Sequence, residues 1–268
     1  MGRWFKSFFE ETRHTVLVAG RTTALTYEAL VQKSDVVILS VPISAVEGVC
    51  RRIGPAMDPS QLLMDICSLK EDVLKHMLEN TSAQVVGTHP LFGPATEKLC
   101  GQNIIICPGR GTDRLSRMES LFRSEGAVLT RMDPREHDRH MALVQGLTHF
   151  LTVSLGRTLQ KLNLRPHDAL QVATPVFRTQ LNLVGRLFAQ DLELFQDLIR
   201  INPYMESTLE IFLSSLAESR QELIAADDPS LGKSYMKGIH EFLNPFCEQG
   251  LAESNLLLNA LYSNLTKK

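Results

Sequence analysis

A histidine and a serine lie in two short segments whose residue types could remove a proton from an alcohol. His89 lies in residues 87–94 (GTHPLFGP), and Ser68 lies in residues 65–70 (DICSLK). A neutral histidine is the usual general base near pH 7, and a neighbouring serine hydroxyl can hold both the imidazole and a substrate hydroxyl. From spacing alone, a helix N-cap serine and an ordinary loop histidine are the plainer interpretations.

The first half of the sequence alternates between apolar strands and amphipathic helices, beginning with a helix that contains Phe5, Phe8 and Phe9. Near-continuous apolar strands separated by helices are typical of a parallel sheet covered on both faces. The sequence therefore predicts an α/β domain with a doubly wound, Rossmann-type parallel sheet. The predicted strands are 15–18, 35–41, 62–66, 84–86 and 103–106, and the later helices are 26–33, 43–53, 69–79 and about 113–125.

The pattern changes near residue 133, where long segments with helical periodicity replace the strands. We expect a dinucleotide-binding domain over 1–133 and an all-helical substrate and dimerisation domain over 134–268. Residues 136–162 have the periodicity of one long helix.

A doubly wound sheet commonly binds a dinucleotide through GxGxxG between its first strand and first helix. Here the chain starts at Met1 and enters the first helix at once, so we expect Gly2 to replace the third glycine and the first strand to be missing. Three explanations stay open. The natural start lies upstream, the chain is a shortened folded version, or it is a degenerate relative without turnover.

Four further residues are predicted to bind the cofactor. Arg21 follows the predicted strand 15–18, where an arginine suits the 2′-phosphate of NADP, although a surface arginine after a turn glycine is an equally good interpretation. Ser40, Val41 and Pro42 lie where strand 35–41 ends. The choice between NAD and NADP is left open, and Arg21 favours NADP.

Composition excludes several other classes of partner. Twenty-eight Lys and Arg against thirty Asp and Glu give a net charge of −2, so we expect neither nucleic acid nor a membrane surface as a partner. No apolar stretch approaches the roughly 20 residues of a membrane span. Five cysteines without a CxxC pair indicate the reducing cytoplasm and no metal site.

Several motifs, in order, resemble the prephenate dehydrogenases of tyrosine biosynthesis, and most closely the dehydrogenase domain of the bacterial bifunctional chorismate mutase/prephenate dehydrogenases. The resemblance covers essentially the whole chain. The motifs are the Ser-x-Lys turn at 68–70, HPLFGP at 89–94, QGLTHF at 145–150, TPVFR at 174–178 and VGRLFAQD at 184–191.

The resemblance implies a role for each of six residues. His89 would accept the proton of the substrate's C4 hydroxyl and Ser68 would orient the pair. Arg186 would bind the ring carboxylate, and the residues implied to line or adjoin the pocket are Gln145, His149 and Arg178. The resemblance also implies a homodimer formed by the helical domain, with the active site in the cleft between domains.

Elementary chemistry agrees with these implied roles. Prephenate is a dianion, and a guanidinium can grip a carboxylate through two hydrogen bonds. Gln145 and His149, at i and i+4, share one helix face. Arg178 and Arg186 lie on adjacent rather than identical faces if one helix carries both, since eight residues at about 100° each exceed two turns by about 80°.

The implied reaction is the oxidative decarboxylation of prephenate to 4-hydroxyphenylpyruvate, with hydride transfer to NAD or NADP. His149 favours prephenate over arogenate. The alternatives are an arogenate dehydrogenase, a non-catalytic dimeric binding module that has lost cofactor binding, and another Rossmann-type reductase.

Overall fold

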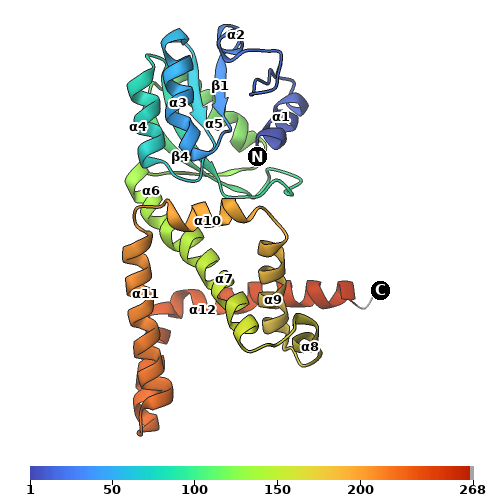
Figure 1. Cartoon of the computed structure of the whole chain (residues 1–268), viewed down its shortest axis with the longest axis vertical. Helices are drawn as coiled ribbons and strands as arrows, with labels where there is room; N and C mark the ends of the chain where they lie inside the picture. The colour runs from blue at the N-terminus through green and yellow to red at the C-terminus, as the bar shows by residue number, and fades with distance from the viewer. Residues whose placement is uncertain (266–268) are drawn as a thin grey trace. The chain divides into compact units, whose positions relative to one another are not determined.

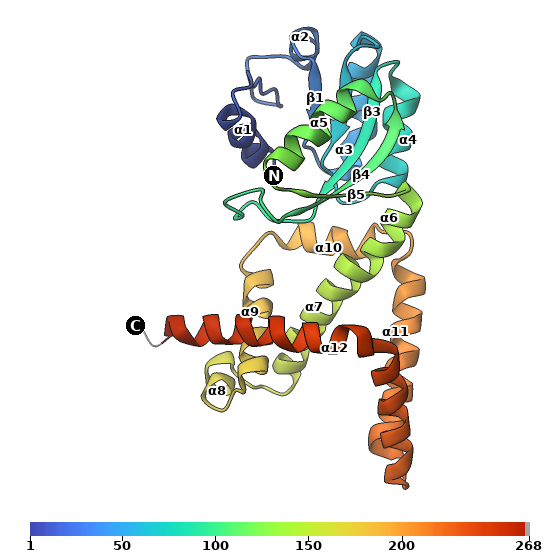
Figure 2. The same ribbon diagram turned by 180° about the vertical axis from the view of Figure 1, so that it is seen from behind.

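The computed structural model describes residues 1–265, and the chain divides into two compact units, Met1–Met141 and Ala142–Lys268. We refer to them as the first unit and the second unit, and we describe each by itself (Figures 1 and 2).

The first unit contains a five-stranded sheet in the order β1-β2-β3-β4-β5. Strands β1, β2 and β3 are parallel, β4 runs antiparallel to β3, and β5 is parallel to β4. The predicted parallel sheet is confirmed as the dominant pairing, and the exception is β4, which the sequence does not reveal as antiparallel. A parallel neighbour needs a long crossover connection, usually a helix, whereas residues 91–102 contain no helix and the chain turns back. The strands are Val36–Leu39, Leu62–Asp65, Gln84–Pro90, Asn103–Arg110 and Val128–Arg131.

Helices cover both faces of this sheet, as the sequence predicts. Alternate side chains of each strand point to opposite faces, so Leu63 packs in one apolar cluster and its neighbours Leu62 and Met64 in another. The first cluster receives α2 (Tyr27–Gln32), α3 (Ile43–Ile53), α4 (Glu71–Asn80) and α6 (Pro134–Met141), and the second receives α1 (Gly2–Glu11) and α5 (Asp113–Ser124).

The predicted strand 15–18 is not a strand. Residues 14–20 have no regular secondary structure, and the side chain of Val18 is 52% exposed. A β-branched run becomes a strand only where a neighbour pairs with its backbone. No backbone hydrogen bond joins 15–18 to a strand in the described part of the chain, where β1 pairs with β2 alone.

The second unit is helical, as predicted. Residues 136–162 do not form one regular α-helix: a π-helical segment, η2 (Ala142–Leu147), lies between α6 and α7. The π-helical turns accommodate more residues per turn than an α-helix and are frequent at functional sites. The other helical elements are α7 (Thr148–Lys161), α8 (Pro166–Gln171), α9 (Pro175–Phe188), α10 (Leu192–Arg200), α11 (Met205–Arg220), the π-helical η3 (Gln221–Ala225) and α12 (Pro229–Leu265).

The second unit leaves many apolar side chains uncovered. Its apolar cluster contains only three buried residues, Leu159, Ala169 and Leu181. Helices α11 and α12 carry large exposed apolar side chains, and Phe242 is 84% exposed. Helix α12 bends in its middle (Figure 2), and Pro245 inside it accounts for a bend because proline removes a backbone hydrogen bond. No helix among the described residues is long and apolar enough to cross a membrane.

Two glycines of the first unit should respond in opposite ways to substitution by alanine, because only Gly54, in η1 (Gly54–Ala56), lies against the end of α4. A Cβ on Gly54 would lie 2.0 Å from the carbonyl oxygen of Asn80, so Gly54→Ala should cost about 1–3 kcal/mol or more of stability. Gly48, on the exposed side of α3, has nothing within 4 Å, so Gly48→Ala should stabilise by up to about 1 kcal/mol. Urea unfolding followed by the fluorescence of Trp4, the single tryptophan, reports on this unit. Equal stability of the two variants would contradict the packing described.

Candidate active site

His89 lies near the carboxyl end of β3 and is almost completely buried, with 3% of its surface exposed. Its Nδ1 lies 2.9 Å from Nε2 of His137, and Nδ1 of His137 lies 2.6 Å from Oδ1 of Asp138. His137 and Asp138 are adjacent buried residues of α6. The three side chains form a chain of hydrogen bonds that begins at the sheet and ends at a carboxylate.

Asp138 also caps the first turn of α4. Its Oδ1 accepts the backbone N–H of Lys70 at 2.8 Å, and its Oδ2 accepts that of Glu71 at 2.9 Å. The first N–H groups of a helix have no partner within the helix, and an ionised carboxylate at this end is also favoured by the helix dipole. The cap of α4 therefore comes from a residue 67–68 positions further along the chain.

A second buried carboxylate fixes the turn that follows β2. Asp65, the last residue of β2, accepts a hydrogen bond from the ammonium of Lys70, and both side chains are fully buried. Asp65 also accepts the backbone N–H groups of Cys67 at 2.8 Å and Thr88 at 3.2 Å. Nζ of Lys70 donates to the carbonyl oxygen of Thr88 at 2.8 Å. These bonds join the carboxyl ends of β2 and β3, one residue before His89.

The surroundings of His89 favour its neutral form. Burial is the largest cause that holds the pKa of His89 well below its ordinary value of 6.5, and the nearby ammonium of Lys70 lowers it as well. The imidazole is therefore unprotonated near pH 7, as a general base must be.

Ser68 lies in the same turn as Lys70 and is half-buried. No hydrogen bond joins Ser68 to His89 among the described residues. Ser68 is not the N-cap of α4 either, because that position is occupied by Lys70 and Asp138 supplies the cap.

The structure brings two of the predicted cofactor-binding residues together. Gly2 begins α1 and faces Ser40, which follows β1, and a Cβ on Gly2 would lie 2.7 Å from Oγ of Ser40. Val41 packs against the first apolar cluster and Pro42 is the N-cap residue of α3. Arg21 is exposed in the turn that the hydrogen bonds between Gly20 and Thr23 close.

Gln145 and His149 lie on consecutive turns of the second unit. Gln145 belongs to the π-helical η2, and His149 belongs to the first turn of α7. The ring of His149 contacts Phe195 of α10 edge-on, with 4.8 Å between the ring centroids. Burial lowers the pKa of His149.

The two predicted arginines share α9 but differ in their surroundings. Nη2 of Arg178 donates to the carbonyl oxygen of Leu170 at 3.4 Å, and its buried Nε has no hydrogen-bond partner among the described residues. Arg186 is exposed. A free planar guanidinium is therefore available to an anion at 186, whereas that of Arg178 is partly engaged with α8.

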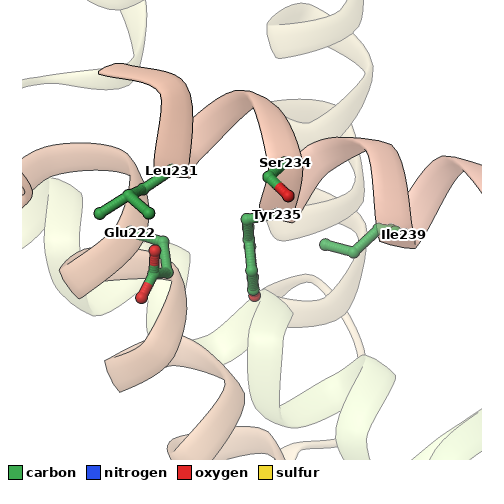
Figure 3. Close-up of a pocket in the computed structure, with 6 residues that line it drawn as sticks. Glu222, Leu231, Ser234, Tyr235 and Ile239 are labelled. Carbon is green, nitrogen blue, oxygen red and sulfur yellow. The ribbon is translucent and has the colours of Figure 1, made fainter. Parts of the chain in front are cut away.

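Two cavities differ in whether a predicted site residue lines them. A cavity of about 1180 Å³ in the first unit is lined by the start of α1, including Gly2, and by residues 94 and 96–100. A cavity of about 460 Å³ lies in the second unit, and its lining includes Leu231, Tyr235 and Ile239 of α12 and Glu222 of η3 (Figure 3). None of the predicted site residues lines this second cavity.

The buried ion pair predicts a large loss of stability on Lys70→Met. This substitution leaves the carboxylate of Asp65 buried without its countercharge and should cost about 3–5 kcal/mol. Lys75→Met, on the exposed side of α4, should change stability by no more than about 0.5 kcal/mol. Urea unfolding followed by Trp4 fluorescence measures both, and Lys70→Met with Asp65→Asn should recover part of the loss. Wild-type stability of Lys70→Met would show that the ion pair does not hold the turn.

Comparison with known sequences finds relatives over the whole chain. Residues 12–131 match the nucleotide-binding domain of prephenate dehydrogenase, and residues 133–237 match its dimerization domain. A probable arogenate/prephenate dehydrogenase of Methanocaldococcus jannaschii is 31% identical over 100% of this chain and 64% of its own length. The T-protein of Enterobacter agglomerans is 30% identical over 97% of this chain and 69% of its own length. The chain thus spans about two thirds of the length of these relatives.

Solved structures share the fold. The prephenate dehydrogenase of Aquifex aeolicus, in complex with hydroxyphenyl propionate and NAD+, superimposes with a TM-score of 0.61 at 19% identity, covering 81% of this chain and 78% of that one. The arogenate dehydrogenase of Synechocystis has a TM-score of 0.64 at 18% identity, covering 83% and 81%. Together with the two domain matches and the 30% identity to a relative of which it covers two thirds, this shows that the chain belongs to the prephenate dehydrogenase family.

Proposed function

We propose that this chain is a prephenate dehydrogenase, which converts prephenate to 4-hydroxyphenylpyruvate by oxidative decarboxylation. The observation that carries the proposal is His89, a buried and neutral imidazole at the carboxyl edge of a doubly wound sheet. Ligands of such sheets bind at that edge. Family membership supplies the class of substrate.

His89 removes the proton of the substrate's C4 hydroxyl in this proposal. Loss of that proton accompanies departure of the hydride from C4, and the electron pair left by departure of carbon dioxide from C1 makes the ring aromatic. The C4 oxygen, now a phenolate, takes the proton back from His89 to give the phenol of the product. A bound nicotinamide supplies the hydride acceptor. Because aromatisation drives the reaction, the protein mainly positions the substrate and balances its charge. Ser68, in the turn before α4, is proposed to orient the hydroxyl and the imidazole.

Cationic and polar side chains of the second unit are proposed to bind the dianion. Arg186 is exposed and can hold a carboxylate through two parallel hydrogen bonds. Gln145 and His149 are proposed to line the pocket, with Arg178 close to it. His149, neutral through burial, is proposed to recognise the keto acid side chain that distinguishes prephenate from arogenate.

The start of α1 fits a dinucleotide. Gly2 approaches Ser40 closely, since a Cβ at position 2 would lie 2.7 Å from Oγ of Ser40, and the start of α1 lines a wide cavity. Helix N-termini bind phosphate groups because their N–H groups are unpaired. Gly2, Ser40, Val41 and Pro42 are proposed to hold the cofactor, with Arg21 beside the ribose.

We also propose that the chain acts as a homodimer through its helical part. The exposed apolar side chains of α11 and α12 support this, as does the match of 133–237 to a dimerization domain. The proposed division of labour is a nucleotide-binding part over 1–133 and a substrate and dimerisation part over 134–268. Helix α6, which carries His137 and Asp138, follows this boundary in sequence and packs with the first unit.

Replacement of the base tests the proposal directly. In His89→Asn, the amide nitrogen can still donate to His137, but the second ring nitrogen is gone. Turnover of prephenate should fall by about 10²–10⁴-fold or more, because that is the usual contribution of a general base, and prephenate binding should hardly change. Steady-state kinetics and calorimetry measure the two quantities.

The matched control is His140→Asn, an exposed histidine on α6, which should retain wild-type turnover. Near-normal turnover in His89→Asn would remove His89 from the catalytic role. Faster turnover of arogenate than of prephenate by the unsubstituted chain would change the proposed substrate and leave the base assignment intact.

The nucleotide preference depends on Arg21. If its guanidinium binds a 2′-phosphate, Arg21→Ala should weaken NADP+ binding about 10–100-fold, the usual value of a charge-assisted hydrogen bond, and hardly affect NAD+. Arg51→Ala, which removes an exposed ion pair with Glu47 on α3, is the control. An equal loss for both nucleotides would contradict this role. Absence of saturable binding of either nucleotide would favour a non-catalytic binding module.

A further inference from the structure

The hydrogen bonds of Asp138 have a fixed direction. Both of its oxygens face backbone N–H groups, of Lys70 at 2.8 Å and of Glu71 at 2.9 Å, and a backbone N–H can only donate. Both oxygens are therefore acceptors, at a helix N-terminus that favours a negative charge. The third group on this carboxylate, Nδ1 of His137, lies 2.6 Å from Oδ1 and accordingly donates its proton.

This direction continues to His89. A neutral imidazole carries one ring proton, so His137, with its proton on Nδ1, presents a lone pair on Nε2. That lone pair lies 2.9 Å from Nδ1 of His89. Two lone pairs would repel at this distance, so Nδ1 of His89 is the donor.

We propose that His137 and Asp138 fix the tautomer of His89, with the proton on Nδ1 and the lone pair on Nε2, the atom that accepts the substrate proton. The inference rests on the proposed function of His89 as a base. In the opposite tautomer Nε2 carries the proton, and the ring has no lone pair with which to remove the hydroxyl proton. His137 and Asp138 are positioning residues, because they act through His89.

The same chain supports His89 after proton transfer. The imidazolium formed in the reaction keeps its Nδ1–H directed at His137, whose own proton is held by the carboxylate of Asp138. A carboxylate behind a catalytic histidine stabilises the imidazolium in this way without taking up the proton itself. Lys70, whose charge acts on His89, is paired with Asp65 in the turn after β2.

Two substitutions break the chain at different points. Asp138→Asn keeps the shape of the cap but turns one acceptor into a donor, and His137→Phe keeps a ring but removes the acceptor. We expect kcat to fall about 10²–10⁴-fold in Asp138→Asn, as for an amide behind a catalytic histidine, with KM little changed. Asp72→Asn, an exposed acidic residue in the same turn of α4, is the matched control and should retain kcat.

The pH dependence of kcat/KM distinguishes a positioning role of His137 from a purely structural role. In the unsubstituted chain, kcat/KM should stay level until well below pH 6.5, because the pKa of His89 is lowered and its base form persists. In His137→Phe the Nδ1–H of the imidazolium loses its acceptor, so the pKa of His89 should fall further and the acidic limb should move to lower pH. An acidic limb at the same pH in both proteins would contradict the proposal.

A measurement that needs no turnover tests the tautomer itself. Correlation of ring protons with ring nitrogens in protein labelled with ¹⁵N-histidine distinguishes protonated from unprotonated nitrogens, and His89→Asn identifies the signals of His89. We expect the Nδ1–H tautomer in the unsubstituted chain and its loss in Asp138→Asn. The Nε2–H tautomer in the unsubstituted chain would overturn the inference. The Nδ1–H tautomer without any turnover of prephenate or arogenate would overturn the proposed function alone.

Discussion

The carboxylate of Asp138 holds together three elements that are far apart in the sequence. It binds the first N–H groups of α4, orients His137 on its own helix, and reaches His89 on β3 through that histidine. A neutral side chain could not accept all three hydrogen bonds on two oxygens. The position of the imidazole thus depends on one carboxylate, placed at a helix N-terminus that favours a negative charge.

The neighbouring ion pair of Lys70 with Asp65 has an energetic cost and an effect on His89. Burial of two charges is expensive, and a well-packed apolar pair of the same volume often gives equal or greater stability. Here the pair also fixes the carboxyl ends of β2 and β3, and its ammonium helps to keep His89 unprotonated. The fold therefore retains charges at a place where apolar packing alone would give no control over the base.

The sequence predicts most of the fold and part of the candidate site. Apolar periodicity identifies β1 to β4 and the helices that cover them, because each of these elements buries its own apolar side chains. The prediction of a strand at 15–18 is wrong because strand formation depends on a neighbouring strand. The β propensity of the residues contains no information about such a neighbour. His89 is proposed from its motif, whereas no hydrogen bond joins Ser68 to it among the described residues.

His137 and Asp138 escape sequence reasoning for a different reason. Helix α6, with the sequence PREHDRHM, is polar between its terminal residues Pro134 and Met141, so its buried face cannot be recognised by apolar periodicity. The partners of Asp138 are 67–68 residues earlier in the chain, and no local pattern connects them. A signal was nevertheless available, since an adjacent histidine and aspartate in the first helix after a sheet are unusual core residues. Buried charged groups need partners, and a base is one of the few reasons to keep them.

The small apolar cluster of the second unit has a thermodynamic consequence. The uncovered apolar surface of α11 and α12 is extensive. The buried apolar residues in the described part of the second unit are few for its length, and they are Ala142, Leu147, Leu159, Ala169, Leu181, Val184, Leu187 and Met205. In the proposed homodimer, covering that surface releases water from it and contributes driving force. Association and folding of these helices are then linked by mass action, so the heat resistance of the unit rises with protein concentration.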